Sequence, residues 1–217
     1  MDWLMGKGKK KASTSEEKKL YMEAKYFENG IIEGDLHSML TLHPGTDQNE
    51  WMAAQTLSFF NHFNLLYGAI SELCTTTSCP VMSAGSLQYH WQDEAKGKKS
   101  KLSAPQYVDL VMTTCQKMLQ DDSLFPTKFG QTFPPNFISL VRKVFRLIFH
   151  VAAHVYHHHY SDIIQLELYR HWNSLFTHFI YFSLKFDLLD QKELTPLASL
   201  VEFISTKDGT RTESVPS

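Results

Sequence analysis

Two cysteines and a cluster of histidines are the residues of this sequence best suited to bind a metal ion. Cys74 and Cys79 are separated by four residues, and histidines recur within residues 153–159. Two thiolates and two neutral imidazoles complete the tetrahedral shell of a structural zinc ion, and both spacings lie within the range of such sites. The sequence therefore predicts one structural zinc ion that joins two segments far apart in the chain.

The spacing of the histidines alone does not decide which two of them bind the metal. At about 100° per residue, His154 shares a helical face with both His150 and His158, so either pair could chelate a metal ion. His154 and His159 lie about 140° apart, so this pair requires the helix to end or unwind between them. The spacing by itself favours His154 with His158.

A catalytic zinc ion is the main alternative to a structural one. Catalytic sites usually have three protein ligands, an open position for water and a general base such as the glutamate of His-Glu-x-x-His. This chain offers four ligands and lacks that motif, and it also lacks a P-loop, a Gly-x-Ser-x-Gly elbow and kinase signatures. We therefore expect a non-catalytic protein, with a zinc-dependent hydrolase as the less favoured alternative.

The composition fits one globular protein inside the cell. A chain of 217 residues with a hydrophobic share of 43% can bury a sizeable core. The net charge of −2 disfavours a zinc-containing nucleic-acid-binding module, because such modules carry a basic surface. No apolar run approaches the roughly 20 residues that span a bilayer, and the N-terminus lacks a signal-peptide core. We expect an intracellular protein, in the cytoplasm or the nucleus, with no membrane insertion.

Hydrophobic periodicity predicts that an all-α helical bundle positions the metal ligands. Aromatic–polar alternation around residues 88–91, followed by a charged turn, predicts a small β-hairpin before residue 102. Long helices are expected over residues 47–73, 103–119, from 135 through the histidine cluster, 162–186 and 190–205, with a short one over 16–27.

Helix starts and an aromatic stripe support this assignment. Three capping boxes mark helix starts: Asp47 with Glu50, Ser103 with Gln106, and Asp190 with Glu193. The first long helix carries aromatic side chains three and four residues apart, which indicates core packing rather than a base-stacking platform. These side chains include Phe59, Phe60, Phe63 and Tyr67.

Composition also sets the limits of the domain. Residues 1–14 are rich in lysine and are expected to form a flexible basic tail. From residue 206 to residue 217 the threonine, glycine, serine and proline content predicts a disordered tail. A single zinc-stapled helical domain is therefore expected over residues 15–205.

Several short motifs are spread over about residues 45–205. They include Asn49-Glu50-Trp51, Cys74-Thr-Thr-Thr-Ser-Cys79-Pro, Ser103-Ala-Pro-Gln-Tyr107, Ala153-His-Val-Tyr156 and His178-Phe179. Together these motifs resemble those of the MOB family of kinase regulators. Residues 1–7 further resemble the second type of animal MOB protein, which binds NDR kinases.

The resemblance implies the MOB fold with one bound zinc ion and a non-catalytic role. Its zinc ligands would be Cys74, Cys79, His154 and His159, so the resemblance replaces His158, which the spacing favours, with His159. The protein would bind the basic N-terminal regulatory segment of an NDR- or LATS-type serine/threonine kinase and modulate its activity. The family's kinase-facing surface maps onto Glu50, Trp51, Leu65, Leu66, Leu166 and His178.

Two qualifications concern this surface. Burial of Trp51 in the core is an equal alternative, because a tryptophan at a helix start looks the same in either case. The sequence also departs from the best-known members at His62 and Glu167, where they carry glutamine, so these positions could select the kinase.

A second family site, which binds phosphorylated peptides, is degraded in this sequence. Its three basic positions fall at Arg146, Leu147 and His150. A phosphate dianion is best bound by charged donors, whereas leucine supplies none and histidine is mostly neutral at pH 7. We therefore predict weak or absent phosphopeptide binding.

Overall fold

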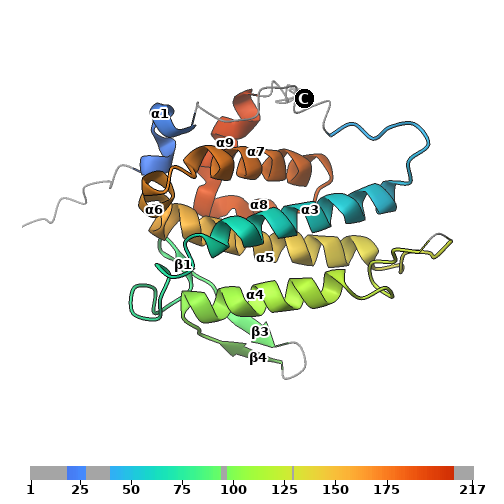
Figure 1. Ribbon diagram of the computed structural model, residues 1–217, viewed down its shortest axis with the longest axis horizontal. Helices are drawn as coiled ribbons and strands as arrows, with labels where there is room; N and C mark the ends of the chain where they lie inside the picture. Colours follow the sequence, from blue (N-terminus) through green and yellow to red (C-terminus); the bar gives the residue numbers. More distant parts are fainter. Residues whose placement is uncertain (1–18, 28–39, 94–96, 129, 208–217) are drawn as a thin grey trace, which may run out of the picture.

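Four long helices form the body of the protein, which is known from a computed structural model that describes residues 19–27, 40–93, 97–128 and 130–207. Helix α5 is central and contacts both α3 and α4, while α7 packs on α3 (Figure 1). No helix in the described ranges is both long and apolar enough to cross a membrane. The four helices are α3 (Gln48–Gly68), α4 (Ala104–Leu119), α5 (Phe137–His158) and α7 (Tyr169–Lys185).

Shorter elements surround this body. A 3-10 turn η1 (Leu20–Met22) and α1 (Ala24–Phe27) precede it, α6 (Tyr160–Gln165) links α5 to α7, and the C-terminal part contains α8 (Gln191–Leu194), η2 (Thr195–Leu197) and α9 (Ala198–Lys207). Two antiparallel hairpins pair β1 (Ser83–Ala84) with β2 (Leu87–Gln88), and β3 (Trp91–Asp93) with β4 (Lys98–Ser100). The all-α bundle and the small hairpin β3–β4 are confirmed.

Side-chain hydrogen bonds fix the starts of two long helices. The Asp47 carboxylate accepts the N–H groups of Asn49 and Glu50 at 2.8 and 3.0 Å, which satisfies two free donors of α3. At α4, the Gln106 side-chain oxygen accepts the Ser103 hydroxyl at 2.8 Å and its N–H at 3.3 Å. Asp190 makes no such cap, so the third capping box does not form.

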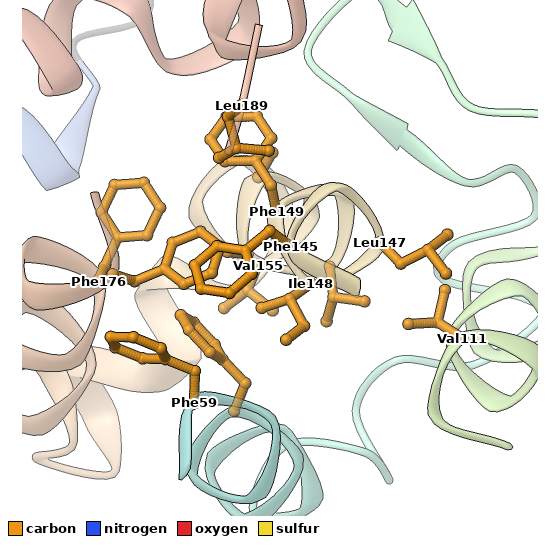
Figure 2. Packing of buried hydrophobic residues seen from close by; sticks show 14 of the residues in the cluster. Phe59, Val111, Phe145, Leu147, Ile148, Phe149, Val155, Phe176 and Leu189 are labelled. Carbon is orange, nitrogen blue, oxygen red and sulfur yellow. The ribbon is translucent and has the colours of Figure 1, made fainter. Parts of the chain in front are cut away.

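The core is rich in aromatic rings from three helices. Figure 2 shows Phe145 of α5 beside Phe59 of α3 and Phe176 of α7, while Leu147 on the opposite flank of α5 faces Val111 of α4. The centroids of Phe59 and Phe145 are 5.7 Å apart in an edge-to-face arrangement, which aromatic pairs prefer. The aromatic stripe predicted for the first long helix is buried as expected.

Three predicted helices end or break earlier than expected. The helix expected over residues 162–186 is interrupted between α6 and α7, where Glu167 adopts a left-handed φ of 58°. The helix expected from residue 190 is divided into α8, η2 and α9 at Pro196, whose ring cannot continue a regular helix. The first long helix ends at Gly68 rather than at residue 73.

The hairpin β1–β2 was not predicted, since its strands have only two residues each. Its turn contains Gly85 with φ of 59°, and a Cβ there would lie 3.2 Å from the His157 ring. Both the turn and this close approach therefore favour glycine. The predicted tail of residues 1–14 and residues 208–217 lie outside the described residues, while α9 continues through Lys207, two positions into the segment predicted as tail.

Candidate metal centre and partner-binding surface

Cys74, Cys79, His154 and His159 come together in one buried cluster, with their ligand atoms all within 4.8 Å of one another. The Cys74 sulfur lies 3.5 Å from Nε2 of His154, and the Cys79 sulfur lies 3.4 Å from Nε2 of His159. Tetrahedral coordination with bonds of about 2.3 Å to sulfur and about 2.0 Å to nitrogen separates the two atoms by about 3.5 Å. The cluster therefore has the geometry to hold a metal ion.

The two halves of the cluster come from different kinds of structure. Cys74 follows the last turn of α3, and the loop to Cys79 is fixed by Ser78, whose hydroxyl accepts the Thr75 N–H at 2.9 Å and donates to the Leu73 carbonyl at 2.9 Å. His154 lies inside α5, whereas His159 lies at the junction of α5 and α6. A metal ion here would join the loop after α3 to the end of α5.

The helix end decides which histidine faces the cysteines. Helix α5 stops at His158, and His159 leaves helical geometry with φ of −128° and ψ of 10°. This is the break that the pair His154 and His159 requires. His158 instead points its Nε2 toward the Ser83 hydroxyl at 3.1 Å, so the choice of His158 from spacing alone was wrong.

Hydrogen bonds orient both imidazoles toward the sulfur atoms. Nδ1–H of His154 donates to the Ser83 carbonyl, and Nδ1–H of His159 donates to the Asp162 carboxylate, each at 2.8 Å. Both Nε2 lone pairs are therefore available to a metal ion. Burial lowers the pKa of His154 to about 4, so this imidazole is neutral at pH 7 and can act as a ligand.

Without a metal ion, the surroundings of Cys74 disfavour the thiolate form of its side chain. Burial raises the pKa of the Cys74 thiol to about 11, and a hydrogen bond from Tyr67 offsets only part of this shift. A bound cation would reverse the preference, because thiolates that coordinate a metal are deprotonated. The donor set therefore suits a metal site better than a reactive cysteine.

The sequence of residues 28–197 matches the Mob1/phocein family, and the match covers most of the chain. The chain belongs to the Mob1/phocein family. The resemblance inferred from the short motifs is confirmed by this match.

Relatives that are similar along most of the chain are named as kinase activators. MOB kinase activator 2 of Mus musculus is 44% identical over 213 residues, which cover 96% of this chain and 90% of that protein. The Homo sapiens protein of the same name is 45% identical over 213 residues, with the same coverage. MOB kinase activator-like 1 homolog A of Dictyostelium discoideum is 47% identical over 196 residues, or 89% of this chain and 92% of that protein. The chain is thus a MOB family protein of the second type.

The positions predicted to face a kinase lie on two adjoining helices and on the turn between α6 and α7. Leu65 is 71% exposed and Leu166 is 46% exposed, although both are large apolar side chains. The Glu50 side chain is also exposed, at the first turn of α3. Glu50, Trp51, Leu65 and Leu66 belong to α3, His178 belongs to α7, and Leu166 follows α6 (Figure 1).

Trp51 and His178 contribute to packing beside this surface. The half-buried Trp51 ring lies 5.2 Å from the Phe182 ring and 5.4 Å from the Phe186 ring. Part of the Trp51 side chain therefore packs against the core, which was the alternative to a place in the interface. The His178 ring lies 4.9 Å from Phe59. Burial and the nearby His62 lower the pKa of His178, which therefore stays neutral at pH 7.

The three positions predicted to form a degraded phosphopeptide site border a cavity of about 1610 Å³ on the other flank of α5. Arg146 is exposed there, while Leu147 and His150 are buried. Lys143 of the same helix also lines the cavity. The sequence did not reveal that Lys19, Lys99 of β4 and Lys192 of α8 line it too, because these residues lie in other segments of the chain.

Both ring nitrogens of His150 make hydrogen bonds to neighbouring side chains. The Tyr107 hydroxyl donates to its Nδ1 at 2.8 Å, and its Nε2–H donates to the Glu193 carboxylate at 3.0 Å. The Tyr89 ring stacks on the imidazole at 4.0 Å. Burial lowers the pKa of His150, so it carries no charge at pH 7 with which to attract an anion.

Proposed function

We propose that this protein is a non-catalytic adaptor that binds the basic N-terminal regulatory segment of an NDR- or LATS-type serine/threonine kinase and modulates the activity of that kinase. The observation that carries the proposal is the similarity of 44–45% over 96% of the chain to two proteins named MOB kinase activator 2. Membership of the Mob1/phocein family supports a regulatory rather than an enzymatic role.

The exposed side chains on α3 and beside α6 fit such a partner. Leu65 and Leu166 offer apolar area, and the exposed Glu50 offers negative charge. A basic amphipathic segment would bury its apolar side on the leucines, while its cations would pair with carboxylates. Burial would then supply most of the affinity, and charge would mainly set orientation and association rate.

We infer that the metal ion is zinc and that its role is structural. Two cysteines and two histidines at tetrahedral distances are the donor set that zinc prefers. Four protein ligands leave no open position for a substrate or a reactive water. Zinc would supply a closed crosslink between the loop after α3 and the end of α5, so the chain's kinase-facing residues rather than the metal would contact the partner.

The proposal is tested by charge reversal at Glu50. Glu50→Lys should weaken binding of a synthetic kinase N-terminal segment about tenfold or more, because an attraction of about 1 kcal/mol for a charge pair at about 4 Å in water is replaced by a repulsion of similar size. Asp109→Lys is the matched control, since Asp109 is an exposed carboxylate on α4. Binding is measured by calorimetry, and thermal unfolding checks that both variants remain folded.

Unchanged affinity in Glu50→Lys would remove this residue from the interface. If the wild-type protein captured no kinase of this class from a cell lysate, and no basic kinase segment bound in calorimetry, the adaptor function itself would be wrong.

A further inference from the structure

We propose that Asp162 is a positioning residue that links metal binding to the turn carrying Leu166 and Glu167. Its side chain and its backbone make hydrogen bonds in opposite directions along the chain. Oδ2 accepts Nδ1–H of His159 at 2.8 Å, and the Asp162 carbonyl accepts the N–H of Leu166 at 3.0 Å. One residue thus contacts both a metal ligand and a residue of the proposed kinase-facing surface.

On the metal side, Asp162 holds a ligand that the helix does not position. His159 lies between α5 and α6 with non-helical backbone angles, so its ring depends on side-chain contacts for its orientation. The carboxylate fixes the tautomer that presents Nε2 to the metal and increases the basicity of the ring. His154 differs, because its Nδ1–H donates to a backbone carbonyl that no side-chain substitution removes. Asp162 is therefore the orienting group that substitution can remove.

On the other side, Asp162 stabilises a turn with little regular structure of its own. Helix α6 has only six residues, which is too short to be stable in isolation. The turn after it places Glu167 at φ of 58°, a conformation that side-chain-bearing residues adopt only when neighbouring structure holds them there. The N–H groups of Leu166 and Leu168 bond back to the carbonyls of Asp162 and Ile163 at 3.0 and 2.9 Å. Movement at the start of α6 would therefore reach this turn.

The coupling has a defined direction. With a metal ion on Nε2 of His159, Nδ1–H would be a stronger donor, and Asp162 would then accept a tighter hydrogen bond and hold the first turn of α6. Ile163 is buried and also anchors α6, so we expect loss of Asp162 to loosen the turn rather than unfold the domain. The part of the inference that concerns the kinase-facing role of Leu166 rests on the proposed function, whereas the link to the metal does not.

The first experiment measures zinc affinity of the full chain by competition with a chromogenic chelator. Asp162→Ala should weaken zinc binding about 10- to 100-fold, the usual effect of removing a group that orients a metal ligand. Asp162→Asn retains an acceptor without the charge and should give a smaller loss. Ser161→Ala, at the exposed neighbouring position, is the control and should match the wild type. Wild-type affinity in Asp162→Ala would overturn the positioning role.

The second experiment measures amide hydrogen exchange of zinc-saturated protein. Exchange at Leu166 and Leu168 should increase about tenfold in Asp162→Ala relative to Ser161→Ala, while amides inside α4 and α7 remain protected. Equal exchange in the two variants, or a uniform increase over all helices, would overturn the coupling. If Asp162→Ala does not fold, the same comparison is made with Asp162→Asn, and unchanged exchange at both amides then overturns the coupling. Neither measurement uses a kinase, so a failure of the proposed adaptor function would be visible separately.

Discussion

Leu65 provides the sharpest separation between binding and stability in this protein. Its side chain is 71% exposed on α3, whereas Phe63, two residues earlier, has no exposed surface. Leu65→Ala should therefore change the free energy of unfolding by less than about 0.5 kcal/mol, because alanine is also a good helix former and no core contact is lost. Phe63→Ala should reduce it by about 3–5 kcal/mol.

The effect of Leu65→Ala on binding follows from the area that a partner would cover. Full burial of a leucine contributes about 1.5–3 kcal/mol, so covering a side chain that starts 71% exposed contributes about 1–2 kcal/mol. This loss corresponds to a dissociation constant about 5- to 30-fold weaker. Leu87→Ala is the matched control, since Leu87 is 45% exposed on β2 and lines the cavity on the other flank of α5.

The assay combines two measurements on each variant. Fluorescence anisotropy with a labelled kinase N-terminal segment gives the dissociation constant, and urea unfolding gives the stability. Binding within twofold of the wild type in Leu65→Ala would show that this leucine is not covered by the partner. A stability loss above about 1 kcal/mol in Leu65→Ala would instead show that this side chain packs against the domain.

Three further predictions concern the metal, pH and phosphate. Cys79→Ser should reduce the zinc content measured by mass spectrometry and lower the melting temperature, because three ligands remain. Burial lowers the pKa of His178 below 6.5, so the unfolded chain binds protons more readily than the folded one, and the free energy of unfolding falls as the pH drops below about 6.5. His178→Phe should make the free energy of unfolding, measured by urea titration at several pH values, fall less steeply over this range. A phosphorylated peptide should bind weakly or not at all in calorimetry, and micromolar affinity would contradict this.

Local signals in the sequence predicted the parts of the fold that depend on local physics. Asp47 and Ser103 start helices because their boxes satisfy free backbone donors within three residues. The sequence also predicted that the aromatic stripe of α3 is buried, since a regular helix places residues three and four apart on one face. Neither inference needs information from another part of the chain.

Two of the missed breaks, unlike those at Gly68 and Pro196, are marked by no glycine or proline. Residues 158–161 and 166–168 contain neither residue type, yet one helix ends in the first segment and Glu167 turns left-handed in the second. Tertiary packing overrides helical propensity at such places. The cations at the large cavity were missed for a related reason, because Lys99 and Lys192 meet Arg146 only through the folded arrangement of β4, α8 and α5.

The end of α5 connects the metal site with the direction of α6. In an unbroken helix, His154 and His158 would share a face, and His159 would point about 140° away from His154. The cysteines meet His159 because the backbone leaves helical geometry there. A metal ion that binds His154 and His159 must favour the broken arrangement over a continuous helix, since a ligand shifts an equilibrium toward the state that it binds more tightly. The same break starts α6, so the identity of the second histidine and the position of the turn at Leu166 are two consequences of one backbone feature.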